Sequence, residues 1–155
     1  MEALGLGLFM IAAGVYATVF LSPGSPVRMA VESELLRRAL TGLATALTLV
    51  AIAYSPIGKR SGAHLNPAVT LSFLRIGRVN PQDAFYYIAA QFIGGLTGVG
   101  ATALLLGDWF RQPPISYIAT EPGSLGTGAA FIAEVAISFV LMTTILLVLG
   151  SDKLR

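Results

Sequence analysis

Four long apolar runs constrain the fold of this chain more than any other feature of its sequence. They cover about residues 3–22, 39–55, 82–107 and 127–150, and the first of them holds twenty residues without a charge. A helix needs about 20 apolar residues to cross the ~30 Å hydrocarbon core of a bilayer. Only 12% of all residues are charged, against roughly 25% in soluble domains. The sequence therefore predicts an all-α membrane protein, with four transmembrane helices in a single domain over residues 1–155.

The segments between these runs look like connections. Ser22-Pro-Gly-Ser-Pro26 is a dense turn signal after the first run. We expect the next segment to be a mixed-charge loop that contains Arg28, Glu32, Glu34, Arg37 and Arg38. Between the third and fourth runs, residues 108–126 contain three prolines together with glycines, which predicts an exposed loop.

The stretch Ser61–Thr70 (SGAHLNPAVT) predicts a short helix between the second and third runs. Asn66 is a preferred N-cap residue, because its side-chain oxygen accepts a hydrogen bond from the first turn. Pro67 then falls at the first helical position, where its fixed φ suits the helix. A helix over about residues 67–76 would be about 15 Å long, half of the hydrocarbon core. We therefore expect a re-entrant half-helix that stops near the middle of the membrane.

Such a half-helix favours a pore for neutral molecules. Its N-terminus carries roughly half a positive elementary charge, which opposes cations and protons at the pore centre. Irregular backbone at this depth is tolerated only where it lines a cavity or is buried in protein. Asn66 and the carbonyls of the preceding loop would form a narrow polar track, whereas Asn66-Pro67 without its flanks would indicate an ordinary turn.

Several kinds of protein are excluded by the residue types. The chain has no cysteine and a single histidine, His64, so we expect no disulfide and no Cys-ligated metal. No nucleophile–base set or metal-ligand cluster indicates an enzyme, a metal site or a cofactor. No basic cluster interleaved with aromatic residues indicates nucleic-acid binding. For His64 we expect a vestibule position in which the backbone carbonyl matters more than the ring.

Polar and small residues inside the runs predict helix contacts. Gln91 and Glu134 lie at membrane depth, where an isolated polar group is costly and needs a partner. Glu134 would escape that cost only if it were shallow enough to reach water. Gly94-x-x-x-Gly98 in the third run, together with glycines in the first, predicts close packing of helix backbones, although glycine is common in membrane spans in any case.

The distribution of basic residues predicts the orientation. Lys59, Arg60, Arg75 and Arg78 lie between the second and third runs, and Lys153 and Arg155 lie in the tail. The opposite side holds Arg28, Arg37, Arg38 and Arg111. Cytoplasmic loops carry an excess of Lys and Arg. We therefore expect a multi-pass protein of the cell membrane with both termini in the cytoplasm.

These residues resemble the aquaporin / major intrinsic protein family. Ser61–Thr70 is similar to the first signature loop of that family over ten contiguous residues. Tyr87-Ile-Ala-Ala-Gln91, followed by Gly94-Gly95, resembles its third span. Glu2 and Glu134 fall where the family places a glutamate in its first and fourth spans. The resemblance covers essentially the whole chain.

The resemblance implies an inverted repeat of two three-span halves, each with a half-helix that meets the other at Asn-Pro-Ala. It implies a homotetramer and passive passage of water or small neutral solutes. Asn66 of Asn66-Pro67-Ala68 would donate its amide to the solute, and the carbonyls of Gly62, Ala63 and His64 would accept from it. Glu2, Gln91 and Glu134 would support the structure. Ala46, or its neighbour Thr45, would line the narrowest ring, where alanine suggests a wider pore that admits glycerol.

The chain departs from this pattern in its length. The spacing of Glu2 and Glu134 places a second Asn-Pro-Ala at about residue 198, beyond Arg155. We therefore expect an incomplete inverted repeat, a channel whose other half was lost or is supplied by another polypeptide. Glu134 would brace the absent second loop. The alternative is a non-conducting four-span subunit or remnant that assembles with other polypeptides.

Overall fold

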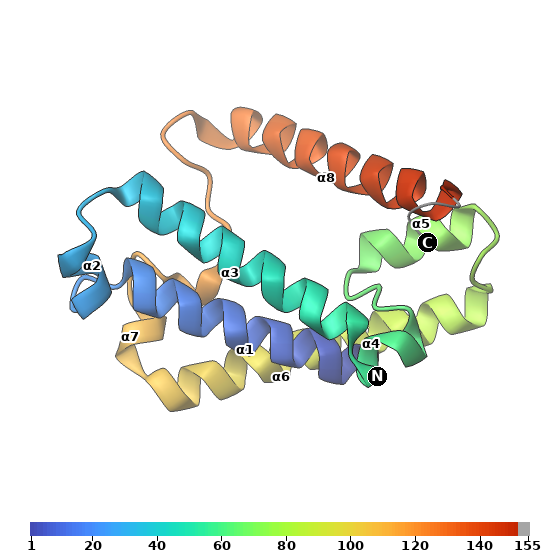
Figure 1. The fold of residues 1–155 in the computed structure, drawn as a ribbon, viewed down its shortest axis with the longest axis horizontal. Helices are drawn as coiled ribbons and strands as arrows, with labels where there is room; N and C mark the ends of the chain where they lie inside the picture. Colours follow the sequence, from blue (N-terminus) through green and yellow to red (C-terminus); the bar gives the residue numbers. More distant parts are fainter. Residues whose placement is uncertain (152–155) are drawn as a thin grey trace. The chain divides into compact units, whose positions relative to one another are not determined.

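The computed structural model describes residues 1–151, and all regular secondary structure in this range is helical (Figure 1). The elements are α1 (Glu2–Leu21), α2 (Pro26–Ala30), α3 (Glu34–Tyr54), α4 (Pro56–Ser61), α5 (Pro67–Arg75), α6 (Pro81–Leu106), α7 (Asp108–Arg111), the 3₁₀ turn η1 (Ser116–Ile118) and α8 (Gly126–Gly150). The chain divides into two compact units, Met1–Ala119 and Thr120–Arg155. Lys153 and Arg155, which enter the orientation argument, lie outside the described residues.

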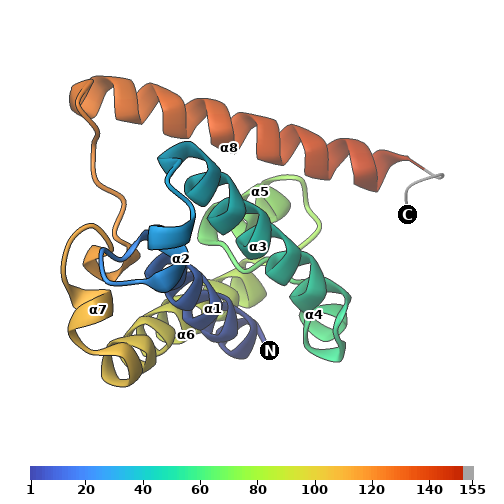
Figure 2. The same ribbon diagram turned by 60° about the vertical axis from the view of Figure 1, so that its left-hand side comes forward.

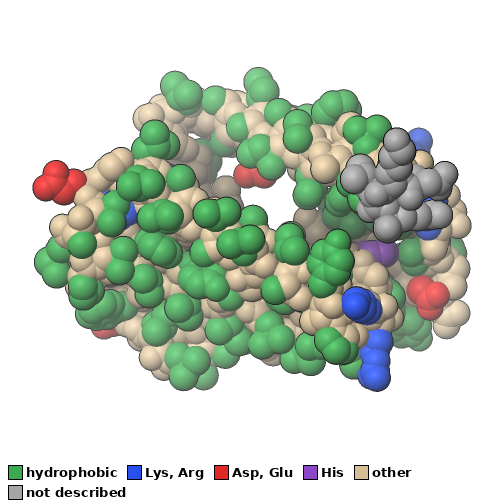
Figure 3. Space-filling model, in the orientation of Figure 1, with side chains coloured by type: hydrophobic (Ala, Val, Ile, Leu, Met, Phe, Trp, Pro, Cys, Tyr) green, Lys and Arg blue, Asp and Glu red, His purple; other side chains and the backbone are tan. Residues whose placement is uncertain are grey.

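Four of these helices, α1, α3, α6 and α8, are long and apolar enough to cross a membrane by their length and composition. The all-helical membrane fold class expected from the sequence is therefore confirmed. The first three belong to the first unit, and α8 is the long helix of the second. Large hydrophobic side chains are exposed along these helices, and hydrophobic side chains are spread over the face seen in Figure 3.

The start of α3 differs from the expectation. The helix begins at Glu34 rather than near Ala39, so part of the expected mixed-charge loop is helical. Ser33 caps it, because the Ser33 Oγ accepts from the Leu36 N–H at 3.3 Å. Arg38 pairs with Glu34 one turn away, with Nη2 and Oε1 2.7 Å apart. Charges arranged at helical spacing therefore extend the helix beyond its apolar run.

In the first unit α1 packs against α3 and α6, which flank it in Figure 2. A Cβ atom at Gly94 would lie 2.1 Å from the backbone oxygen of Ala3, and one at Gly98 would lie 2.5 Å from that of Gly7. No side chain fits at either position. The close backbone packing predicted from Gly94-x-x-x-Gly98 is confirmed.

Residues 108–119 fit the expectation of an exposed loop only in part. Most of them are exposed, but they include α7 and η1, and the ring of Phe110 is completely buried. That ring occupies the space beside Gly14, where a Cβ atom would lie 2.7 Å from it. The buried hydrophobic cluster at this end of the unit comprises Ala17, Ala103, Phe110 and Ile115. The segment therefore closes the core over the ends of α1 and α6.

Candidate functional site

Helix α5 begins as the sequence predicts. Asn66 is its N-cap, with the side-chain oxygen accepting from the Ala68 N–H at 2.7 Å, and Pro67 is the first helical residue. The helix ends at Arg75, nine residues later, which corresponds to about 14 Å. Asn66 and Ala68 are exposed within the first unit. Within residues 1–119 the amide nitrogen of Asn66 donates to no protein atom, so it is available to a ligand.

The loop that leads to Asn66 has an unusual backbone. Gly62, Ala63 and Leu65 all have positive φ values, of 83°, 49° and 46°. For residues other than glycine this left-handed conformation costs about 1–2 kcal/mol each. Such strain persists only where the surrounding structure holds it in place. The loop therefore depends on contacts from other elements.

Glu2 supplies the main contacts. Its carboxylate accepts from the backbone N–H of His64 at 3.2 Å and from that of Leu65 at 2.7 Å. Gln91 donates to the same carboxylate from its side-chain nitrogen at 2.7 Å. Glu2 is 3% exposed and lies in the first turn of α1, where the helix dipole stabilises a negative charge. The carboxylate thus connects α1 to α6 and to the loop through hydrogen bonds.

A second set of hydrogen bonds ties the loop to α5. The Gln91 side-chain nitrogen also donates to Thr70 Oγ1 at 3.0 Å, and Thr70 is completely buried. Thr70 Oγ1 lies 3.2 Å from the Asn66 carbonyl oxygen and 3.1 Å from His64 Nδ1. We call Glu2, Gln91, Thr70 and His64 the polar network. It lies behind the exposed tip formed by Asn66.

Sequence reasoning gave no role to Thr70, Phe73 or Tyr87, although all three hold the loop. The ring of Phe73 stacks on that of His64, with centroids 4.7 Å apart. The Tyr87 hydroxyl donates to the Ser61 carbonyl at 2.8 Å. The sequence did contain a sign of two of these contacts, because residues three or four apart share a helix face. Thr70 follows Asn66 by four residues, and Tyr87 precedes Gln91 by four.

The ring of His64 is half-buried between these aromatic rings.

The remaining predicted residues lie apart from this network. Ala46 is exposed on α3, and Thr45 donates its hydroxyl to the Thr41 carbonyl at 2.7 Å. Glu134 lies on α8, in the second unit. Of the polar groups at membrane depth, Gln91 has partners for its side-chain nitrogen, namely Glu2 and Thr70. Its side-chain oxygen, Oε1, is buried without a partner among the described residues.

Residues 1–151 hold no group of three or more His, Cys, Asp or Glu side chains that is arranged to bind a metal ion.

Comparison with known proteins adds independent information. The family model described as Major intrinsic protein matches residues 4–154. Aquaporin A of Dictyostelium discoideum is 35% identical over 143 residues, which cover 90% of this chain and 50% of that protein. Glycerol uptake facilitator protein-like 6 of Lactiplantibacillus plantarum is 31% identical, over 95% of this chain and 62% of its own length. Aquaglyceroporin AqpS of Rhizobium meliloti is 30% identical, over 94% of this chain and 56% of its own.

The chain thus covers between half and two thirds of the length of these three relatives. No solved structure matches it.

Proposed function

Because the chain belongs to the major intrinsic protein family, we propose that it forms part of a channel through which water or small neutral solutes such as glycerol cross a membrane. Members of this family are channels and not enzymes. The chain is a multi-pass membrane protein. Its relatives include proteins named aquaporin, glycerol uptake facilitator and aquaglyceroporin, which supports both water and glycerol as candidate solutes.

The observation that carries this proposal is the exposed amide of Asn66 at the positive end of α5. One side of the Asn66 side chain caps the helix, and its amide nitrogen remains free within the first unit. A neutral solute with a lone pair would accept a hydrogen bond there and then pass to the carbonyls of Gly62, Ala63 and His64. The positive end of the helix would repel cations.

The polar network supports this proposal because it fixes a strained loop from behind. A pore needs its acceptor groups at constant positions, and irregular backbone at membrane depth must be held by protein. Glu2 and Gln91 satisfy that need from two different helices. We propose that α5 and this loop enter the membrane from the cytoplasmic side, with both termini of the chain in the cytoplasm.

We further propose that more helices complete the pore. A nine-residue helix reaches only about half of the hydrocarbon core, and the relatives are about 1.6 to 2 times as long as the part that matches. The completing helices would come from further sequence, a complementary half or other copies of this chain, with a tetramer as the form expected from the resemblance. Glu134 would then brace the second half-helix.

Osmotic shrinkage of proteoliposomes tests the proposal. Asn66→Ala removes both the cap and the free amide, whereas Asn80→Ala removes a similar cap, because Asn80 also precedes a proline and accepts from a first-turn N–H, that of Asp83, at 2.8 Å. Both changes would cost about 1 kcal/mol of stability. We expect only Asn66→Ala to lower water or glycerol permeability, by up to about tenfold for one lost hydrogen bond. Equal permeability of the two variants would contradict this placement of the pore.

A second candidate function is a non-conducting subunit with four spans that assembles with other polypeptides. It is favoured by the length of α5, because a nine-residue helix reaches only about half of the hydrocarbon core and completes no passage by itself. The permeability of vesicles that contain the purified chain distinguishes the channel from the non-conducting subunit. Permeability no higher than in empty vesicles, together with co-purification of another membrane protein, would favour the subunit.

A further inference from the structure

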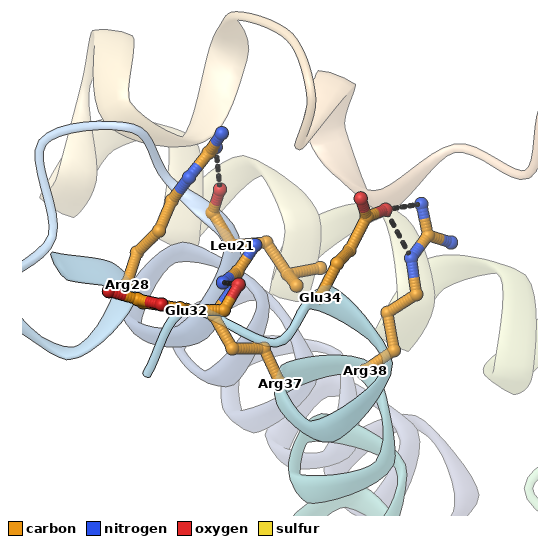
Figure 4. A network of polar contacts seen from close by, with 6 residues as sticks. All are labelled: Leu21, Arg28, Glu32, Glu34, Arg37 and Arg38. Carbon is orange, nitrogen blue, oxygen red and sulfur yellow. Dashed lines mark hydrogen bonds and ion pairs between the residues drawn. The ribbon is translucent and has the colours of Figure 1, made fainter. Parts of the chain in front are cut away.

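Three arginines line a hollow at the end of the first unit where α1 finishes and α3 begins. Figure 4 shows these arginines with their polar contacts. The hollow has a volume of about 280 Å³. Its lining consists of Leu21, Arg28, Glu34, Arg37, Arg38 and Pro114. We call it the arginine pocket. It lies apart from the loop and the polar network described above.

Arg37 is the unusual member of this pocket, because it is only 7% exposed. Its Nη1 donates to the backbone carbonyls of Val31 and Glu32, the latter at 2.7 Å. Its Nε is buried and has no hydrogen-bond partner among the described residues. No carboxylate within residues 1–151 forms an ion pair with it. A buried guanidinium that is not neutralised by an acid favours an anionic ligand.

The other two arginines have hydrogen-bond partners within the first unit. Arg28 donates from Nη1 to the Leu21 carbonyl at 2.7 Å. Arg38 donates from Nε to Glu34 at 2.9 Å, and its Nη2 lies 2.7 Å from the same oxygen. Glu34 is the one carboxylate among the lining residues of the pocket. The lining therefore has a positive excess, with three arginines and one glutamate.

We propose that the arginine pocket binds a phosphate group, carried either by an anionic lipid headgroup or by free phosphate. Guanidinium groups match phosphate oxygens with two parallel hydrogen bonds, which is the strongest form of this contact. The pocket lies at the ends of two helices that are long enough to span the membrane, which is the level of lipid headgroups. Leu21 and Pro114 offer apolar contact for the part of a lipid next to its phosphate.

The substitutions that test this proposal avoid the buried Arg37, whose loss would endanger folding. Arg38→Gln removes a positive charge from a side chain that is 68% exposed. Arg60→Gln is the matched control, since Arg60 is an exposed arginine on α4, outside the pocket. Glu34→Gln removes the competing carboxylate and frees Arg38. We expect Arg38→Gln to weaken binding about tenfold, Arg60→Gln to leave it unchanged and Glu34→Gln to tighten it.

Two measurements distinguish a lipid headgroup from free phosphate. Both use the full chain in neutral detergent, with folding checked by circular dichroism. Native mass spectrometry compares the retention of phosphatidylglycerol with that of phosphatidylcholine, and calorimetry measures the heat of binding of inorganic phosphate. Preferential retention of phosphatidylglycerol that Arg38→Gln reduces identifies a headgroup site. Heat from inorganic phosphate that the same change reduces identifies a site for the free ion.

Three results would overturn the proposal: no binding of either probe, equal effects of Arg38→Gln and Arg60→Gln, or weaker binding after Glu34→Gln. None of them would affect the proposed channel function, because the pocket shares no residue with the loop or the polar network.

Discussion

A single carboxylate, that of Glu2, accepts hydrogen bonds from backbone groups 62 and 63 residues further along the chain. The left-handed conformation of Ala63 and Leu65 is costly without this support. The carboxylate is also buried, so it needs all its donors to offset the loss of water. At the scale of the residue, each group therefore depends on the other. The Glu2 carboxylate holds the loop in its left-handed conformation, and the N–H groups of the loop satisfy the buried carboxylate.

The substitution Glu2→Gln tests this interaction. It keeps the shape of the side chain but replaces one acceptor oxygen by an NH₂ group that faces donors. We expect the chain to lose about 1–3 kcal/mol of stability, the cost of unsatisfied buried groups. Thermal unfolding in detergent measures the loss. Glu32→Gln is the control, because the Glu32 side chain is exposed, and equal unfolding temperatures for the two variants would show that Glu2 does not hold the loop.

Ala46 gives a prediction about solute choice. If it lines the narrowest ring of the pore, Ala46→Trp will lower glycerol permeability strongly and water permeability less, because the indole narrows the passage. The control is Leu47→Trp, at the next position of α3, where the side chain is also exposed. Stopped-flow measurements with both solutes provide the comparison. If the two substitutions lower both permeabilities alike, Ala46 does not lie in the ring.

At the scale of the element, the contact between α1 and α6 requires glycine. The backbones approach so closely at Gly94 that an added methyl group would overlap the backbone oxygen of Ala3. Because both sides of this contact are backbone, no side-chain rotation relieves the overlap, and the helices must separate.

Gly94→Ala should therefore destabilise the first unit by about 1–3 kcal/mol or more, the usual cost of overpacking. Gly100→Ala on the same helix is the matched control, since nothing lies within 4 Å of a Cβ atom there. We expect that change to be neutral or to stabilise by up to about 1 kcal/mol through helix propensity. Chemical denaturation in detergent gives both values, and similar losses in the two variants would contradict the close contact.

Elements were predictable from the sequence where local chemistry determines them. Asn66 and Pro67 mark the start of α5 because capping involves only neighbouring residues. The start of α3 was not predicted, because the charges around Glu34 look like a loop unless their helical spacing is considered. The burial of Phe110 could not be predicted, since the ring packs beside Gly14, almost a hundred residues earlier. The sequence showed that Gln91 needs a partner. It did not identify Thr70 as that partner, because the two residues are also far apart in the chain.

At the scale of the whole molecule, the chain consists of a first unit that contains the loop and the polar network and a second unit that contains α8. Sequence resemblance placed Glu2 and Glu134 in equivalent positions of two halves. Within the first unit, Glu2 accepts hydrogen bonds from the loop at His64 and Leu65. If the proposed channel has a second, equivalent half, we expect Glu134 to hold an equivalent loop there.

The absence of cysteine from the chain makes its orientation testable. Lys59→Cys and Gly24→Cys place single thiols at exposed positions, one in α4 after α3 and one in the turn between α1 and α2 before it. We expect a membrane-impermeant maleimide to label residue 24 from outside intact cells and residue 59 only after the membrane is opened. The cysteine-free parent chain provides the background. The reverse labelling would place both termini outside and would contradict the orientation inferred from the basic residues.

The polar network also has a consequence for synthesis of the chain. Helix α1 leaves the ribosome first, but its carboxylate lacks its final partners until Leu65 and then Gln91 have followed. The full set of hydrogen bonds to Glu2 therefore forms only after this part of α6 is present. Until then the carboxylate is without the donors that offset its burial.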